Sequence, residues 1–170
     1  MLTVVFDVDD FSLRDTFLRT FYFGALDALT PEHRPLWGLM TPQQMVEHLA
    51  WTFEVSTGKA EVDCPTPPDQ IERMKRFLYS KRPSPHDYEN PALIEGLPPL
   101  RQPDLRQARV WLLAEIDRFT THQRTHPTAL HTHPIFGPIG PDEWSRTHFK
   151  HGCHHLLQFE LIDVQAWEAP

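Results

Sequence analysis

The chain has 170 residues and two cysteines, which is typical of one domain, here residues 1–170, whose core does not depend on disulfides. Its formal net charge of −7 argues against a nucleic-acid partner, because phosphate binding requires a basic surface. The sequence lacks a run of about 18 apolar residues and a basic, apolar signal peptide, so we expect a cytoplasmic protein without a membrane partner.

The first half of the chain shows two helical patterns. Residues 1–12 are expected to form an N-terminal arm or a short strand, and a helix is expected over about 13–29, where apolar side chains recur at helical spacing. A second helix has a well-marked start, because Thr41 and Gln44 form a capping-box pattern around a proline. This helix is expected to end near Ser56.

The second half predicts three further helices separated by proline-rich connections. A short third helix is expected to end near Leu78, a fourth to cover about 104–121, and the last to cover about 141–161. The loops 80–103 and 122–140 join them. Strand signals are nearly absent, so the sequence predicts an all-α fold: a four-helix bundle with a short extra helix and long Pro-rich loops.

Histidines on the last predicted helix carry the strongest functional signal. His148, His151 and His155 fall on one stripe at helical spacing, and each buried imidazole needs a polar partner. One metal ion can serve several imidazoles, and a bundle site draws its ligands from facing helices. His48, on the apolar face of the second helix, is the best candidate for the facing ligand. Three imidazoles leave a fourth position open for water, which is typical of catalytic zinc.

The same histidines also have a metal-free interpretation. Core and surface imidazoles can bond to backbone carbonyls and water, and this is the commoner situation for a single residue such as His48. His131 and His133 are a further candidate pair for a surface metal site, although loop histidines are more often solvated. The residues by themselves therefore leave the ligand set open.

Three segments resemble the DinB/YfiT-like superfamily of metal-binding four-helix bundles. Residues 37–49 resemble the helix that carries a single histidine ligand, residues 133–144 resemble the start of the last helix, and residues 151–158 resemble the superfamily's two histidines four apart, followed by glutamine. The resemblance covers about a third of the chain. Characterised relatives include thiol transferases and thiol-dependent isomerases in which a divalent metal activates a low-molecular-weight thiol.

The resemblance implies His48, His151 and His155 as the metal ligands. It makes His148 and His154 neighbours of the site. The sequence departs from the superfamily after the last histidine, because leucines at positions 156 and 157 stand where arginine and glycine are frequent. Contacts made by those two residues in relatives are therefore not expected here.

Four other side chains carry weaker signals. Glu47 is a candidate partner for an imidazole, although a solvated carboxylate is the commoner situation. Cys153 lies almost opposite His151 on the helix, so it is not expected to be a ligand, and Cys64 is expected to be an inert thiol. The sequence does not decide what Gln158 binds.

The first functional hypothesis is a metal-dependent enzyme of the thiol-transferase or hydrolase type. Zinc, with nickel as the alternative, would activate a water or a low-molecular-weight thiol against a small electrophilic substrate held under the two long loops. Trp51, Trp144 and His148 are expected to contact that substrate. The alternatives are a non-catalytic metal-binding bundle with a structural or protein-interaction role, and a metal-free helical module. The last helix is apolar nearly all round, so either the N-terminal arm or a second subunit is expected to cover it, and the second possibility suggests a homodimer.

Overall fold

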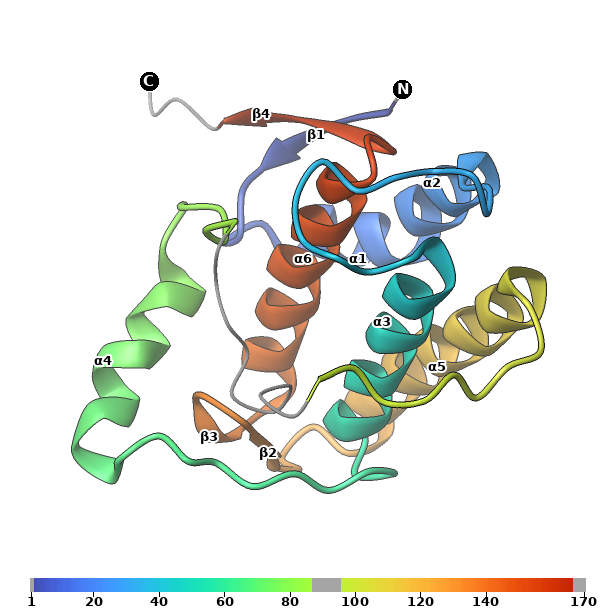
Figure 1. Ribbon diagram of the computed structural model, residues 1–170. Coiled ribbons are helices and arrows are strands. Elements are labelled where there is room, and N and C mark those ends of the chain that lie inside the picture. The colour runs from blue at the N-terminus through green and yellow to red at the C-terminus, as the bar shows by residue number, and fades with distance from the viewer. Residues whose placement is uncertain (1, 87–95, 167–170) are drawn as a thin grey trace.

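A computed structural model describes residues 2–86 and 96–166 of the protein, and most of these residues are helical (Figure 1). The expected mainly helical fold is thus confirmed. The first long helical run contains a π-helical turn, η1, which the sequence pattern did not predict. The bounds of the helices, in chain order, are α1 (Phe11–Thr16), η1 (Phe17–Phe21), α2 (Tyr22–Ala28), α3 (Pro42–Ser56), α4 (Pro68–Tyr79), α5 (Leu105–Thr125) and α6 (Pro141–Gln158).

Helix α3 begins and ends where the sequence predicts. The backbone N–H of Gln44 donates to Thr41 Oγ1 at 3.2 Å, and the backbone N–H of Thr41 donates to Gln44 Oε1 at 2.9 Å. Two residues beyond Ser56, Gly58 adopts a φ of 73°, a left-handed conformation that favours glycine and ends the helix. These two signals place His48 in the middle of α3.

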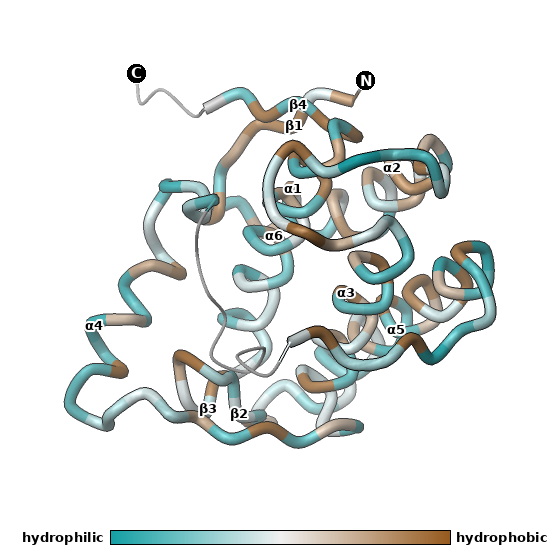
Figure 2. The backbone as a smooth tube through the Cα atoms, viewed as in Figure 1, coloured by the Kyte–Doolittle hydropathy of each residue, from teal (hydrophilic) through white to brown (hydrophobic). Residues whose placement is uncertain are grey.

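The core holds α3 against α5 on one side and α6 on another. Hydrophobic and hydrophilic stretches alternate along these helices (Figure 2), as expected of helices that bury one face. Aromatic rings interlock across the core, with centroids 5.6 Å apart for Phe53 and Phe119 and 5.0 Å apart for Phe17 and Phe149. Helices α3 and α6, which carry the histidines of interest, are therefore held in place by a well-packed core.

The fold is mainly helical rather than all-α, because short strands also form. A strand was one of the two alternatives expected for residues 1–12, whereas the other strands were not expected. Strand β1 (Leu2–Phe6) pairs in parallel with β4 (Ile162–Ala166), and β2 (His131–His133) forms a hairpin with β3 (Gly137–Ile139). Helix α6 stops before the predicted residue 161, since Glu160 takes a φ of 55° and the chain turns into β4. Pairing between the two ends of a chain is long-range, so local periodicity does not reveal it.

The N-terminal strand covers part of α6. The rings of Phe6 and Phe149 lie 5.3 Å apart, and β4 also contacts the helix. The chain's own ends thus account for burial that had suggested a second subunit, and the homodimer stays a prediction. Of the loop 80–103, residues 87–95 lie outside the described part of the chain. No helix in the described ranges combines the length and apolar character needed to cross a membrane.

Candidate metal centre

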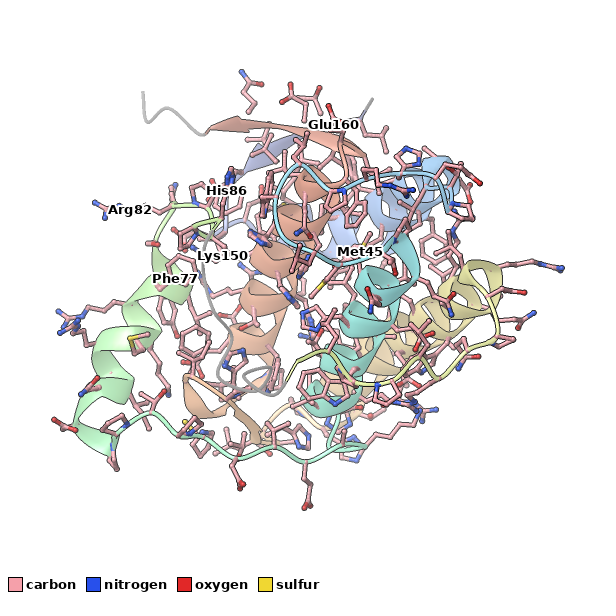
Figure 3. All side chains as sticks on the ribbon, viewed as in Figure 1. Met45, Phe77, Arg82, His86, Lys150 and Glu160 are labelled. Carbon is pink, nitrogen blue, oxygen red and sulfur yellow. The ribbon has the colours of Figure 1, made fainter. Side chains whose placement is uncertain are left out.

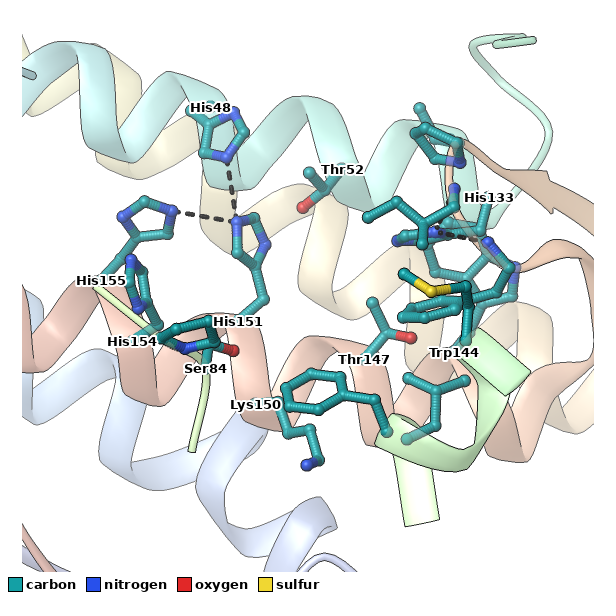
Figure 4. Close-up of a pocket in the computed structure, with 18 of the residues that line it drawn as sticks. His48, Thr52, Ser84, His133, Trp144, Thr147, Lys150, His151, His154 and His155 are labelled. Atoms are coloured by element: carbon teal, nitrogen blue, oxygen red, sulfur yellow. Dashed lines mark hydrogen bonds between the residues drawn. The ribbon is translucent and has the colours of Figure 1, made fainter. Parts of the chain in front are cut away.

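Three histidine side chains from two helices converge at one point. His48 projects from the middle of α3, while His151 and His155 project from successive turns of α6 (Figure 4). His151 Nε2 lies 2.9 Å from His48 Nε2 and 2.9 Å from His155 Nε2. One ligand atom from each ring lies within 4.8 Å of the others, so the group could hold a metal ion. The structure thus brings together the three residues expected to be ligands.

Gln158 fixes the orientation and the protonated nitrogen of His155. Its amide Nε2 donates to the backbone carbonyl of Trp37 at 2.7 Å, which directs its carbonyl Oε1 toward His155 Nδ1, 2.9 Å away. A neutral His155 must therefore carry its proton on Nδ1 and keep a lone pair on Nε2. An outer hydrogen bond of this kind is the usual support for a metal-binding imidazole. Gln158 follows His155 by three residues, a spacing that puts both side chains on one face of a helix, but the sequence does not decide what Gln158 binds.

Hydrogen bonds among the three rings do not satisfy all the converging nitrogens. His151 Nε2 is close to two other Nε2 atoms but has at most one hydrogen to share, and His155 Nε2 carries none. His48 Nδ1 is buried without a hydrogen-bond partner in the described part of the chain. A cation that accepts the three Nε2 lone pairs removes the conflict among the converging nitrogens, and His48 Nδ1 then carries the hydrogen of its ring. The donor set therefore fits a metal of the kind that imidazole binds.

Burial keeps these three rings neutral. It lowers the pKa of His48 to about 4, and nearby His154 acts in the same direction. Burial, together with the neighbouring imidazoles, also lowers the pKa of His151 and of His155 well below the usual histidine range. Neutral imidazole is the form that binds metals, so the folded site presents its ligands ready for a cation.

A cavity of about 400 Å³ opens from the cluster between α3 and α6 (Figure 4). Trp51 and Trp144 line it, and their contact with a substrate stays a prediction. Helix α4 and the β2–β3 hairpin also form part of its wall, including Phe77 and Phe136, and the sequence pattern did not predict this contribution. The amphipathic pattern of α4 predicted that one face of this helix is buried, but it did not predict which part of the protein that face contacts.

His148, the third expected substrate contact, does not line this cavity. Its ring stacks on Phe53 with centroids 3.7 Å apart, and its Nε2 lies 2.8 Å from Ser56 Oγ. It is thus a satisfied core histidine. His154 lines the cavity beside the cluster, and its Nε2 accepts a hydrogen bond from Trp37 Nε1 at 3.4 Å.

Glu47 follows neither interpretation considered for it. Its carboxylate is buried and accepts backbone N–H groups of Arg101 at 2.6 Å and Gln102 at 3.1 Å, together with the side-chain amide of Gln43 at 3.0 Å. Glu47 therefore anchors the end of the 80–103 loop to α3, next to the site. It is neither a solvated carboxylate nor a partner of the imidazoles.

The loop histidines do not pair as considered. His131 Nε2 lies 2.9 Å from His122 Nε2, whereas His133 Nδ1 accepts the backbone N–H of Ile135 at 3.1 Å. Cys153 is buried, and burial raises the pKa of its thiol, so it is an inert core residue.

The fold and the site define a mainly helical protein with a histidine cluster able to bind one metal ion. The chain belongs to the family described as "Protein of unknown function (DUF1569)", whose model matches residues 41–161 and so includes the whole histidine cluster. Among solved structures, a crystal structure of TT2238, described as a four-helix bundle protein, is 23% identical. It covers 86% of this chain and 92% of its own, with a TM-score of 0.40. A search of curated proteins finds no match.

Proposed function

We propose that this protein is a metal-dependent enzyme of the transferase or hydrolase type that acts on a small electrophilic substrate. The observation that carries the proposal is the opening of the three-nitrogen cluster into a cavity large enough for a small molecule. A purely structural metal site usually has four protein ligands and no access. Here three imidazoles converge, and one side of the cluster faces the cavity.

The roles of the residues follow from their positions. His48, His151 and His155 would hold the ion, with zinc as the favoured metal and nickel as the alternative. A bound divalent ion supplies Lewis acidity, which polarises a carbonyl and lowers the pKa of a water or a low-molecular-weight thiol. Gln158 keeps His155 in the tautomer that can bind, and Trp51 and Trp144 form walls against which a substrate packs. The order of the motifs supports placing the family in the DinB/YfiT-like superfamily.

Metal content tests the proposal directly. Protein purified without a histidine tag should contain about one divalent metal per chain by elemental analysis, and His151→Ala or His48→Ala should lose it. His126→Ala is the matched control, because His126 is exposed and distant in sequence from the cluster. A content near zero in the unmodified protein that His151→Ala does not change would refute the metal site.

A second candidate is a non-catalytic metal-binding bundle. The observation in its favour is that the ligands lie on two different helices, so an ion would tie α3 to α6. This role predicts that chelation strongly lowers the melting temperature while neither thiols nor electrophiles perturb the spectrum of cobalt exchanged into the site. Spectral changes on adding a thiol or an electrophile would instead favour the enzyme.

A further inference from the structure

The cavity extends from the histidine cluster along α6. His151 and His155 lie at one end, and Trp144 and His133 lie toward the other (Figure 4). Residues 144 and 151 on a helix are about 10 Å apart along its axis. With a volume of about 400 Å³, the cavity can take a small molecule that touches the cluster with one end only.

Apolar side chains form most of the wall away from the cluster. They come from three elements that are distant in the sequence: α3, α4 and the β2–β3 hairpin. The side chains are Val55, Met74, Phe77, Leu78, Ile135 and Phe136. Burial of a ligand's apolar surface against a wall of this composition favours binding.

Two of the hydroxyl groups along the cavity already donate to the protein. Thr52 Oγ1 donates to the backbone carbonyl of Leu49 at 2.8 Å, and Thr147 Oγ1 donates to that of Glu143 at 2.9 Å. These two hydroxyls therefore offer a ligand no hydrogen, and the neutral His133, whose Nδ1 accepts a backbone N–H, offers only the one on its Nε2. Burial of unpartnered polar groups is costly, so the cavity disfavours phosphorylated or highly hydroxylated molecules.

The charges near the cavity do not point to a charged ligand body. Lys150 lines the cavity with its aliphatic stem, but its ammonium group points away from His48 (Figure 4) and lies near Phe77 and Arg82 (Figure 3). Its Nζ donates to the backbone carbonyl of Arg82 at 2.7 Å and lies 3.9 Å from the ring centre of Phe77. Arg73, the other cation of the wall, is exposed on α4 and so reaches water.

We propose that the substrate is a neutral, hydrophobic molecule with one polar reacting group, which meets the histidine cluster while the rest of the molecule fills the cavity. This inference rests on the proposed function. An extended alkyl chain advances about 1.25 Å per bond, because its bonds zigzag, so roughly eight bonds match the distance from His151 to Trp144. A single aromatic ring with a short side chain fits the same space.

A series of straight-chain alkyl hydroxamates tests the proposal on the zinc-loaded protein. The hydroxamate group binds zinc, and the alkyl chain reports on the cavity. By calorimetry, we expect the dissociation constant to fall about threefold to fourfold per methylene up to roughly eight carbons and then to level off. A dissociation constant that does not change with chain length, or tighter binding of a succinate monohydroxamate than of its neutral homologue, would overturn the proposal.

A cavity-filling variant separates the cavity from the metal. Thr147→Phe places a ring in the middle of the cavity, whereas Thr121→Phe, exposed on α5, is the matched control. Thr147→Phe should leave zinc content and acetohydroxamate affinity unchanged and weaken the octyl compound at least tenfold. Equal affinities of both variants for the octyl compound would place the alkyl chain elsewhere.

A binding measurement on metal-free protein distinguishes failure of this inference from failure of the proposed function. The uncharged dye N-phenyl-1-naphthylamine should bind to chelator-treated protein, gain fluorescence and receive energy from the tryptophans, and Thr147→Phe should abolish this binding. Dye binding without any zinc binding would refute the enzyme and retain the apolar ligand site. Zinc binding without dye binding or chain-length dependence would refute the apolar ligand and retain the metal.

Discussion

Gln158 determines which nitrogen of His155 faces the metal position, because it joins His155 Nδ1 to the backbone carbonyl of Trp37. Gln158→Leu keeps a side chain of similar size but removes this acceptor. We expect the affinity for zinc to fall by about tenfold to a hundredfold, the usual cost of losing an outer partner of a ligand. Competition with a chromophoric chelator measures this affinity.

The matched control for that variant is Gln123→Leu. Gln123 also loses a side-chain hydrogen bond, to the carbonyl of Pro141, but it lies at the end of α5. Its zinc affinity should stay within about twofold of the unmodified protein. Equal affinities for the two variants would mean that Gln158 does not support the ligand.

The burial of His133 leads to a prediction of how the stability of the metal-free protein depends on pH. Burial lowers its pKa from 6.5 to about 3, so below pH 6.5 the unfolded chain binds a proton that the folded chain does not. The stability that this neutral ring contributes is complete above pH 6.5 and is lost as the pH falls toward 3, by about 1.4 kcal/mol per pH unit. His133→Asn, whose side-chain oxygen can accept the same backbone N–H groups, should show a shallower fall.

Urea unfolding of metal-free protein at pH 6.5 and pH 5 measures this difference. The unmodified protein should lose about 2 kcal/mol more than His133→Asn over this interval. His126→Asn, on an exposed histidine, should behave like the unmodified protein. Parallel losses in all three proteins would show that His133 is accessible to protons when folded.

At this scale the sequence predicted which histidines converge better than it predicted their surroundings. Helical spacing placed His148, His151 and His155 on one stripe, and the apolar face of the second helix singled out His48. The choice of His151 and His155 over His148 depended on the family resemblance. His148 shares their stripe but lies one turn, roughly 5 Å, away along the axis, where it meets Phe53 of α3 instead. Periodicity predicts which face of a helix is buried, but it does not predict which other helix or strand each turn of that face contacts.

At the scale of elements, the close approach of α2 and α6 depends on Gly152. A Cβ at this position would lie 2.7 Å from two ring carbons of Tyr22 and closer still to its hydroxyl. In an exposed helix, replacement of glycine by alanine is favourable by about 1 kcal/mol. Here we expect Gly152→Ala to lower the free energy of unfolding by about 1–3 kcal/mol, because the buried ring has no space to move.

A double-mutant cycle isolates this contact. The Tyr22 hydroxyl is buried without a hydrogen-bond partner among the described residues, so Tyr22→Phe by itself should be neutral or slightly stabilising. Combined with Gly152→Ala, it should restore part of the lost stability in urea unfolding. Strict additivity of the two substitutions would mean that α2 and α6 do not press on each other at this point.

Helix termini were the most predictable part of the elements. The capping box at Thr41 and the left-handed Gly58 are local signals, and both act as expected. Helix α5 continues past the expected residue 121 to Thr125, because polar side chains in its last turn lie outside the core and leave no trace in the apolar pattern. The π-helical turn η1 was not predictable, since its sequence is compatible with an ordinary α-helix.

At the scale of the whole molecule, strands β1 and β4 together cover part of α6. Strand β1 pairs with β4 in a register that aligns Val4 with Val164, and Phe6 inserts its ring beside Phe149. The sequence allowed either the arm or a second subunit as the cover of this helix. Choosing between them requires knowing which distant segments meet, and neither composition nor periodicity contains this information.

Phe6→Ala tests whether the arm by itself completes the core. Phe6 is buried against α6, so we expect the variant to lower the free energy of unfolding by about 3–5 kcal/mol, as for other buried phenylalanines. Phe11→Ala is the matched control, since that ring is 61% exposed and should cost well under 1 kcal/mol. Zinc content should not change, because the Phe6 ring packs on Phe149 rather than on any of the three ligands. If the loss from Phe6→Ala instead shrinks as protein concentration rises, a partner subunit shares in covering α6, and the arm does not complete the core on its own.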